Sequence, residues 1–150
     1  MIGSAVVLLW GAGVLAQPAE RPGGRALNDP DLTHIRREFV VDGIQRAALV
    51  FVPKEAGDAP LPVVFAFHGR GGTMQRAAAM FGFHQQWREA IVVYPQGLPT
   101  PGPADPEGKR PGWQVTPLDD RNRDLRYFDV MLAELERDYP VDRRRIYASG

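Results

Sequence analysis

The chain has 150 residues, of which 44% are hydrophobic, and its 18 Lys and Arg residues balance 18 Asp and Glu residues. This length suffices for one ordinary domain and is too short for two, while a formal net charge of +0 gives no basic field that would attract nucleic acid or anionic lipid. Cysteine is absent, which excludes disulfides, thiolate metal sites and cysteine nucleophiles.

An uncharged apolar run (AVVLLWGAGVLA) occupies residues 5–16. It is shorter than the roughly 20 apolar residues that a membrane-spanning helix needs, and its last residues suit a signal peptidase. We expect residues 1–16 to be a signal peptide of a secreted or periplasmic protein with no stable membrane span. A buried strand or an uncleaved anchor is the alternative, because no Lys or Arg precedes the run. Residues 17–32, rich in Pro, Gly and polar side chains, predict a flexible leader.

The first predicted structure is an antiparallel hairpin. Residues 35–41 mix charged and β-prone side chains, which suits an edge strand. Asp42-Gly43 suits a tight turn, and the apolar residues 47–52 predict the returning strand, which Pro53 ends.

Two uninterrupted apolar runs follow, LPVVFAF at residues 61–67 and AIVVY at residues 90–94. Such runs predict strands buried on both faces, as in a parallel sheet. Between them, residues 74–80 and 83–89 are expected to form two short helices. Residues 96–117 hold several prolines and glycines and are predicted to be a long loop, which in a compact domain is usually functional or disordered.

The clearest helix lies after this loop. Its apolar residues step by three, four, three and four along one face: Leu125, Phe128, Leu132, Leu135 and Tyr139. Asp119 or Asn122 could cap its start, and Pro140 ends it, because the residue before a proline avoids the helical region. Residues 145–148 predict a last short strand.

Strands that alternate with helices in this order predict an α/β fold, with a mostly parallel sheet, right-handed crossovers and the antiparallel hairpin at one edge. We expect residues 33–150 to be the N-terminal part of such a domain, which remains incomplete without further residues. In open α/β sheets, ligands bind at the carboxyl ends of the strands. The residues that follow each strand are therefore the candidates for a site.

The first candidate is the glycine loop after residue 67, His68-Gly69-Arg70-Gly71-Gly72. Glycines let backbone N–H groups approach a reacting atom, and the following helix adds the positive end of its dipole, so this loop could form half of an oxyanion hole. It could equally cradle a phosphate, although it lacks both the Walker pattern and G-x-G-x-x-G. A plain turn without a ligand is the third interpretation.

The second candidate is Gly150, which follows a predicted strand. In G-x-S-x-G, the nucleophilic serine stands on a sharp turn between a strand and a helix. If Gly150 is the first glycine of that motif, the serine lies two residues beyond it, and Ser149 belongs to the strand. An ordinary turn is the alternative, since many strands end in glycine.

Four segments together resemble the secreted esterase family of polyhydroxybutyrate depolymerases and feruloyl esterases, within the α/β-hydrolase superfamily. They are LPVVFAFHGRGGT at residues 61–73, IVVYPQG at 91–97, Gly112-Trp113-Gln114, and DLRYFDVMLAELERDYPVDRRRIYASG at 124–150. Each motif alone is weakly specific, whereas their order and spacing together make a strong match.

The resemblance implies a role for each residue of the glycine loop. The backbone N–H of Arg70 is expected to be an oxyanion donor, and His68 to orient the loop rather than to move protons. The supporting glycines are Gly69, Gly71 and Gly72. Many relatives have cysteine where Arg70 stands, a departure that removes a potential disulfide but leaves the backbone donor in place.

The resemblance also places Trp113 beside the substrate pocket. In this fold the catalytic triad follows the chain order Ser, Asp, His, so all three members are expected after Gly150. We therefore predict that no catalytic residue of the triad lies in this chain, and that residues 17–150 alone are inactive and poorly folded, because a central strand is left as an edge.

The remaining histidines and acidic residues have simpler explanations. The histidines are widely spaced, so no metal site is predicted; His34 is expected at the surface and His84 partly buried in a helix. Asp119-Asp120 and Asp124 are surrounded by arginines, which predicts a solvated, charge-balanced helix start.

The predicted function is a serine-dependent carboxylic ester hydrolase that works through an acyl-enzyme and needs no cofactor. Its compatible substrates are hydroxybutyrate polyesters, feruloyl esters and acetyl esters of plant polysaccharides. One rival is a secreted, non-catalytic module that holds a carbohydrate or an anion with the glycine loop and Trp113. The other is a nucleotide-dependent enzyme with a Rossmann-like sheet, which the missing phosphate fingerprint disfavours.

Overall fold

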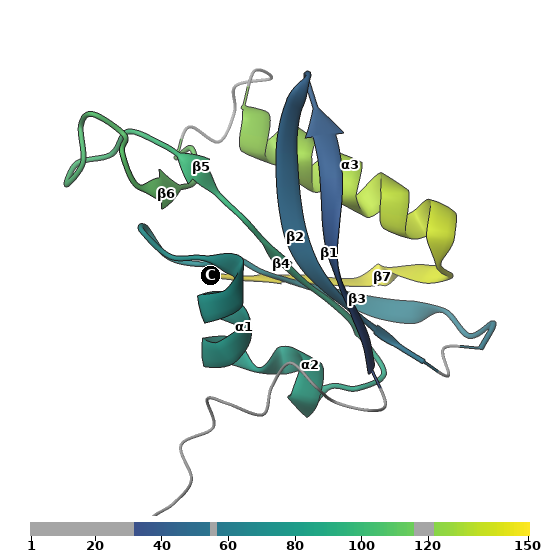
Figure 1. Ribbon diagram of the computed structural model, residues 1–150. Coiled ribbons are helices and arrows are strands. Elements are labelled where there is room, and N and C mark those ends of the chain that lie inside the picture. Colours follow the sequence, from purple (N-terminus) through teal and green to yellow (C-terminus); the bar gives the residue numbers. More distant parts are fainter. Residues whose placement is uncertain (1–31, 55–56, 116–121) are drawn as a thin grey trace, which may run out of the picture.

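The computed structural model describes residues 32–54, 57–115 and 122–150, so the predicted signal peptide and nearly all of the predicted leader lie outside the described residues. Figure 1 shows the arrangement of the elements. In chain order they are β1 (Leu32–Val41), β2 (Ile44–Pro53), β3 (Leu61–Ala66), α1 (Met74–Phe81), α2 (Phe83–Gln86), β4 (Ile91–Pro95), β5 (Leu98–Pro99), β6 (Pro111–Gly112), α3 (Arg123–Asp138) and β7 (Val141–Ser149).

Five strands form the main sheet, in the order β1-β2-β4-β3-β7. Strand β2 is antiparallel to both of its neighbours, whereas β4, β3 and β7 are parallel to one another. Only β2 therefore runs against the common direction, which confirms the mostly parallel sheet with an antiparallel hairpin at one edge. The hairpin turns at Asp42 and Gly43, whose φ values of 50° and 77° are those that a two-residue type I′ turn requires.

Helices cover both faces of the sheet, so the fold has three layers (Figure 1). On one face, Tyr127, Met131 and Leu135 of α3 are buried in one core cluster with Phe39 of β1 and Phe65 of β3. The cluster on the other face, under α1 and α2, includes Leu49, Phe51, Val64, Met74, Ala77, Ala78, Val92 and Tyr94. Every residue of β3 and β4 is buried, because a strand covered on both faces has no solvent side.

The predicted stripe of helix α3 faces the core except at its first residue: Leu135 is buried, and Phe128, Leu132 and Tyr139 pack against the core cluster. The buried residues of the helix are Tyr127, Met131 and Leu135, whereas Leu125, the first residue of the predicted stripe, is 49% exposed. The buried face is centred on an i, i+4, i+8 row that begins with a tyrosine, a residue that the purely apolar pattern left out. Asn122 is the N-cap, because its Oδ1 accepts hydrogen bonds from two backbone N–H groups of the first turn at 3.0 and 3.2 Å.

The described part of the predicted long loop, residues 96–115, contains regular structure, so this prediction was wrong in part. Strands β5 and β6 pair as a small antiparallel sheet, and we call residues 98–112 the β5–β6 excursion. The carboxylate of Asp105 accepts hydrogen bonds from the N–H groups of Arg110 (2.8 Å) and Lys109 (3.2 Å). These bonds, above all the one from Arg110, hold the pKa of Asp105 below its usual range.

Three element boundaries also differ from or refine the predictions. Helix α2 ends at Gln86, three residues before the predicted end, and β7 begins at Val141 and includes Ser149, as the strand assignment of that serine requires. Helix α3 ends before Tyr139, which is extended at φ −140° and ψ 152°, as expected of a residue before proline. Within the three described ranges, none of the helices combines the length and the apolar character needed to cross a bilayer.

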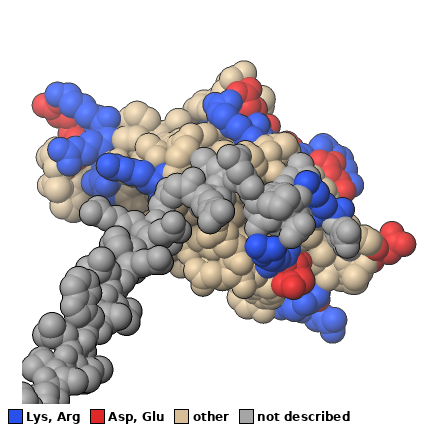
Figure 2. Space-filling view, turned by 60° about the horizontal axis from the view of Figure 1, so that its bottom comes forward, with Lys and Arg blue, Asp and Glu red and all other residues tan. Residues whose placement is uncertain are grey.

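Charged side chains on the surface pair with one another. Arg37 of β1 contacts Glu134 at 2.6 Å and Asp138 at 2.7 Å on α3, which ties the edge hairpin to the helix. Arg143 pairs with Glu136 at 2.6 Å. Figure 2 shows positive and negative side chains side by side on the face that it displays.

Candidate functional site

The glycine loop and Gly150 start from adjacent strand ends. Strands β3 and β7 are parallel neighbours with Ala66 paired to Ser149, and the N–H of Phe67 donates to the carbonyl oxygen of Ser149 at 2.7 Å. A Cβ added to Gly150 would stand 3.2 Å from the Phe67 Cβ. The two motifs therefore lie side by side at the carboxyl edge of the sheet, where open α/β sheets bind ligands.

His68 lies at the centre of the loop's contacts and is only 3% exposed. Its Nε2 accepts a hydrogen bond from the N–H of Gly97 at 2.9 Å, so the ring proton is on Nδ1, which lies 2.8 Å from the carbonyl oxygen of Gly69. The side-chain Nε2 of Gln96 also lies 3.1 Å from the His68 Nε2. Because both ring nitrogens are engaged, His68 holds the loop against the end of β4.

Backbone hydrogen bonds, within the loop and to the β5–β6 excursion, hold the rest of the loop. The N–H of Gly72 donates to the carbonyl oxygen of Gly69 at 2.9 Å, and the N–H of Gly71, at φ 73°, donates to Pro111 of the β5–β6 excursion at 2.7 Å. Thr73 caps α1 by accepting a hydrogen bond from the N–H of the third helical residue at 3.2 Å. In contrast, the N–H of Arg70 makes no hydrogen bond to any residue of the described ranges. The Gly69 N–H likewise makes no hydrogen bond to the described residues, so the loop leaves the backbone donors of Gly69 and Arg70 open.

Trp113 packs against the base of this loop. Its Nε1 donates to the carbonyl oxygen of His68 at 2.7 Å, and its ring meets the Phe67 ring edge to face, with centroids 5.1 Å apart. A mainly apolar cavity of about 410 Å³ opens beside it. The cavity is lined by Phe67, Trp113, Gln114, Asn122, Asp124, Leu125, Phe128 and Ala148.

A larger cavity, of about 760 Å³, opens among residues that include Leu61 and Pro62, at the start of β3. This is the amino end of a parallel strand, and no predicted site residue lines it. We therefore place the candidate site at the carboxyl edge, because ligands of open α/β sheets bind there and the predicted residues meet there.

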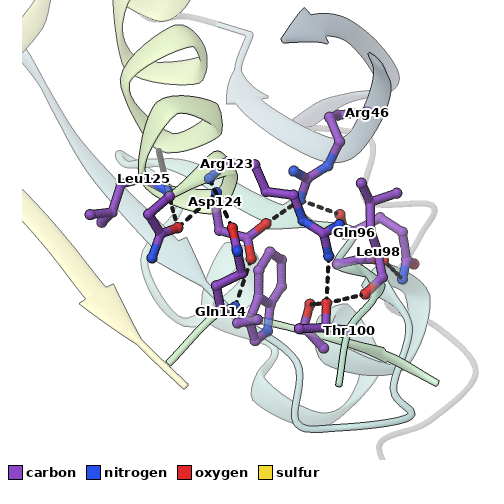
Figure 3. Close-up of polar contacts among 12 residues, drawn as sticks. Arg46, Gln96, Leu98, Thr100, Gln114, Arg123, Asp124 and Leu125 are labelled. Carbon is purple, nitrogen blue, oxygen red and sulfur yellow. Dashed lines mark hydrogen bonds and ion pairs between the residues drawn. The ribbon is translucent and has the colours of Figure 1, made fainter. Parts of the chain in front are cut away.

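A buried ion pair that the sequence did not reveal holds this edge together (Figure 3). Arg46 of β2 and Asp124 of α3 approach to 2.9 Å, with side chains 1% and 10% exposed. Asp124 also accepts a hydrogen bond from the N–H of Gln114 at 2.8 Å, next to Trp113, and the Arg46 guanidinium lies 4.1 Å from the centre of the Tyr127 ring. The prediction that Asp124 belongs to a solvated helix start was wrong, because its partner is a strand residue 78 positions away.

The first residue of α3 is also hydrogen-bonded to the β5–β6 excursion, as Figure 3 shows. The guanidinium of Arg123 donates to the hydroxyl oxygen of Thr100 at 2.6 Å and to the carbonyl oxygen of Pro99 at 3.0 Å. Its backbone N–H donates to the side chain of Gln114 at 2.8 Å. These contacts join the helix, the excursion and the segment after Trp113 into one wall beside the cavity.

The other histidines lie elsewhere. His34 is exposed, as predicted, whereas His84 is 1% exposed and more deeply buried than predicted. The His84 Nδ1 lies 2.8 Å from the hydroxyl of Tyr94, and burial raises the pKa of Tyr94 to about 12. Among the described residues, no group of three or more potential metal ligands occurs; Asp119-Asp120 lie outside these residues.

Comparison with known proteins adds evidence on the fold. No protein-family model matches the chain, and no curated protein matches it. Among solved structures, a hypothetical protein from Pseudomonas aeruginosa matches with a TM-score of 0.56 and 18% identity over 89% of this chain. A thermophilic carboxylesterase from a metagenomic library matches with a TM-score of 0.50 and 19% identity over 82% of this chain. A thermostable esterase matches with a TM-score of 0.50 and 20% identity over 79% of this chain. The described residues have a mixed α/β fold that is similar to the folds of these esterases.

These identities establish the fold alone. The chain spans 39%, 38% and 33% of the lengths of the three structures, in the order given above. This α/β-hydrolase-like fold agrees with the fold that the sequence predicted. The carboxyl edge between β3 and β7 is the place in the described residues where the two predicted motifs meet.

Proposed function

We propose that this chain is part of a serine-dependent carboxylic ester hydrolase. The proposal depends on one observation: the loop that holds an open backbone donor, the N–H of Arg70, and Gly150 follow adjacent strand ends. Two of the structures that share the fold are a carboxylesterase and an esterase, which supports the same chemistry. The motifs of the glycine loop, Trp113 and the last strand favour the narrower family of polyhydroxybutyrate depolymerases and feruloyl esterases.

In the proposed mechanism, Gly150 opens a G-x-S-x-G elbow whose serine stands two residues further on. A histidine takes the serine proton while the serine oxygen attacks the ester carbonyl, and the Arg70 N–H donates to the oxygen that becomes negative. The alcohol leaves with the proton from the histidine, and water then hydrolyses the acyl-enzyme by the same steps in reverse. No step needs a cofactor.

The loop residues have supporting roles in this proposal. His68 fixes the loop through both ring nitrogens and its carbonyl oxygen. Gly69 supplies the carbonyl oxygen that accepts the Gly72 N–H, and Gly71, at φ 73°, makes the turn between them. Trp113 lines the cavity that Phe67 and Ala148, near the two motifs, also line. The triad Ser, Asp and His lies after Gly150 in this scheme, so residues 1–150 supply the oxyanion donor and the scaffold.

The proposed substrates are hydroxybutyrate polyesters, feruloyl esters and acetyl esters of plant polysaccharides. Plant polysaccharide esters lie outside the cell, which fits the proposed signal peptide at residues 1–16 and a secreted or periplasmic location. Mass spectrometry of the mature N-terminus in the exported fraction tests the location. Retention of residue 1 in that fraction would contradict cleavage.

The test of the function uses the complete gene product. We expect a fluorophosphonate to label the serine two residues after Gly150, and p-nitrophenyl butyrate to be hydrolysed; alanine at that serine should abolish both. Comparison of hydroxybutyrate oligomers with methyl ferulate then identifies the acyl group. A different residue at that position, or intact protein that neither reacts nor hydrolyses, would rule out the serine mechanism.

A further inference from the structure

The side chain of Arg70 leaves the glycine loop and reaches the β5–β6 excursion. Its guanidinium donates to the carbonyl oxygens of Thr100 at 2.6 Å and Pro101 at 3.2 Å, and it lies 3.8 Å from the carboxylate of Asp105. Hydrogen bonds from a charged donor are stronger than neutral ones, and the planar guanidinium suits several acceptors at once. One side chain thus connects two segments that are 30 residues apart in the chain.

The excursion leaves space for this group. A Cβ added to Gly102 would stand 2.5 Å from the Arg70 Cζ, and a Cβ added to Gly112 would stand 3.4 Å from it. Gly102 is not among the residues with positive φ, so its backbone conformation does not require glycine. A methyl group at this position would overlap the guanidinium, so the Arg70 side chain keeps its present place only while residue 102 is glycine. Arg70 therefore occupies a fitted contact on the excursion.

The excursion and the segment after it hold the backbone on both sides of Arg70. Before it, the carbonyl oxygen of His68 accepts the Trp113 Nε1 hydrogen bond at 2.7 Å. After it, the N–H of Gly71 donates to Pro111 at 2.7 Å. The open N–H of Arg70 lies between these two attachments, so its direction depends on how firmly the loop and the excursion are held together.

We propose that the Arg70 side chain is a positioning residue that cross-links the glycine loop to the β5–β6 excursion and so aims its own backbone N–H at the reacting carbonyl group. This inference rests on the proposed function. A misplacement of about 1 Å in such a site costs about 100-fold in rate. Loss of the cross-link therefore lowers kcat, and leaves KM nearly unchanged, because the donor acts mainly on the charge that develops in the transition state.

The test compares Arg70→Ala, Arg70→Lys and the control Arg76→Ala in the complete gene product, with p-nitrophenyl butyrate as substrate. Arg76 is an exposed arginine on α1. We expect Arg70→Ala to lower kcat about 10- to 100-fold with KM within about twofold, Arg70→Lys to be intermediate, and Arg76→Ala to match the wild type. A low, non-denaturing concentration of guanidinium should restore part of the Arg70→Ala kcat, which a misfolded protein would not show.

Gly102→Ala provides a second measurement. In the wild type, the added methyl group should displace the guanidinium and lower kcat, whereas in the Arg70→Ala protein it should have little further effect. Two results would overturn the inference and leave the proposed function standing. One is an active wild type whose Arg70→Ala variant keeps its kcat. The other is a double variant in which the losses of kcat from Arg70→Ala and Gly102→Ala simply add. A wild type that hydrolyses no ester would overturn the proposed function, and this inference with it.

Discussion

The buried pair of Arg46 and Asp124 permits a quantitative prediction, because its two members are buried to different degrees. Only 1% of the Arg46 side chain and 10% of the Asp124 side chain are exposed. Asp124→Leu removes the negative charge and leaves a guanidinium that cannot lose its proton in a protein, and the N–H of Gln114 also loses its acceptor. Breaking a buried pair in this way costs about 3–5 kcal/mol, so we expect the free energy of unfolding to fall by that amount.

Arg46→Met should cost less. The remaining carboxylate keeps the hydrogen bond from Gln114 and reaches some solvent, since 10% of its side chain is exposed. The main loss is then the cation–π interaction between the Arg46 guanidinium and the Tyr127 ring, which contributes roughly 1–2 kcal/mol at a desolvated site. The double variant Arg46→Met/Asp124→Leu leaves no uncompensated charge, so it should recover at least about 2 kcal/mol relative to Asp124→Leu alone.

Urea unfolding of the complete gene product, followed by tryptophan fluorescence and far-UV circular dichroism, measures these differences. Asp129→Leu is the matched control, because Asp129 lies on the exposed side of the same helix, and it should change the free energy of unfolding by less than about 0.5 kcal/mol. Equal losses from the two single variants, or a double variant whose loss equals their sum, would refute the reasoning.

Three further predictions concern the loop, a helix cap and pH. A Cβ at Gly72 would meet a backbone carbonyl oxygen at 2.9 Å, so Gly72→Ala should lower the proposed ester hydrolysis about tenfold or more with an unchanged circular dichroism spectrum; full activity would contradict the crowding. Asn122→Ala removes the α3 cap and should cost about 1 kcal/mol in urea unfolding, and no loss would mean that the cap contributes nothing. Hydrogen bonds from Arg137 and Arg37 lower the pKa of Asp138 to about 2. The ionised carboxylate therefore stabilises the folded protein above about pH 4, and this stabilisation is lost as the pH falls through about 2. The Tm difference between wild type and Asp138→Asn should shrink over that range, and a constant difference would disprove the linkage.

Elements whose signal is local could be predicted from the sequence. The hairpin turn needs two residues that tolerate positive φ, and Asp42-Gly43 supplies them. Strands β3 and β4 are covered on both faces, so their burial is visible as unbroken apolar runs. The two-residue strands β5 and β6 are too short to show any period, and their prolines and glycines are equally typical of loops.

The sequence by itself therefore determined the α/β order of the elements and placed the glycine loop and Gly150 at the ends of strands. Only the tertiary structure decided which distant groups meet there: the Arg46 side chain with the Asp124 carboxylate, and the Arg70 side chain with the carbonyl oxygen of Thr100. The physical reason is that burial produces a periodic pattern in the residues of one helix or strand, whereas an ion pair or a hydrogen bond across the fold needs only one residue at each end. Such contacts follow from which strands and helices become neighbours, and they leave no pattern in the chain.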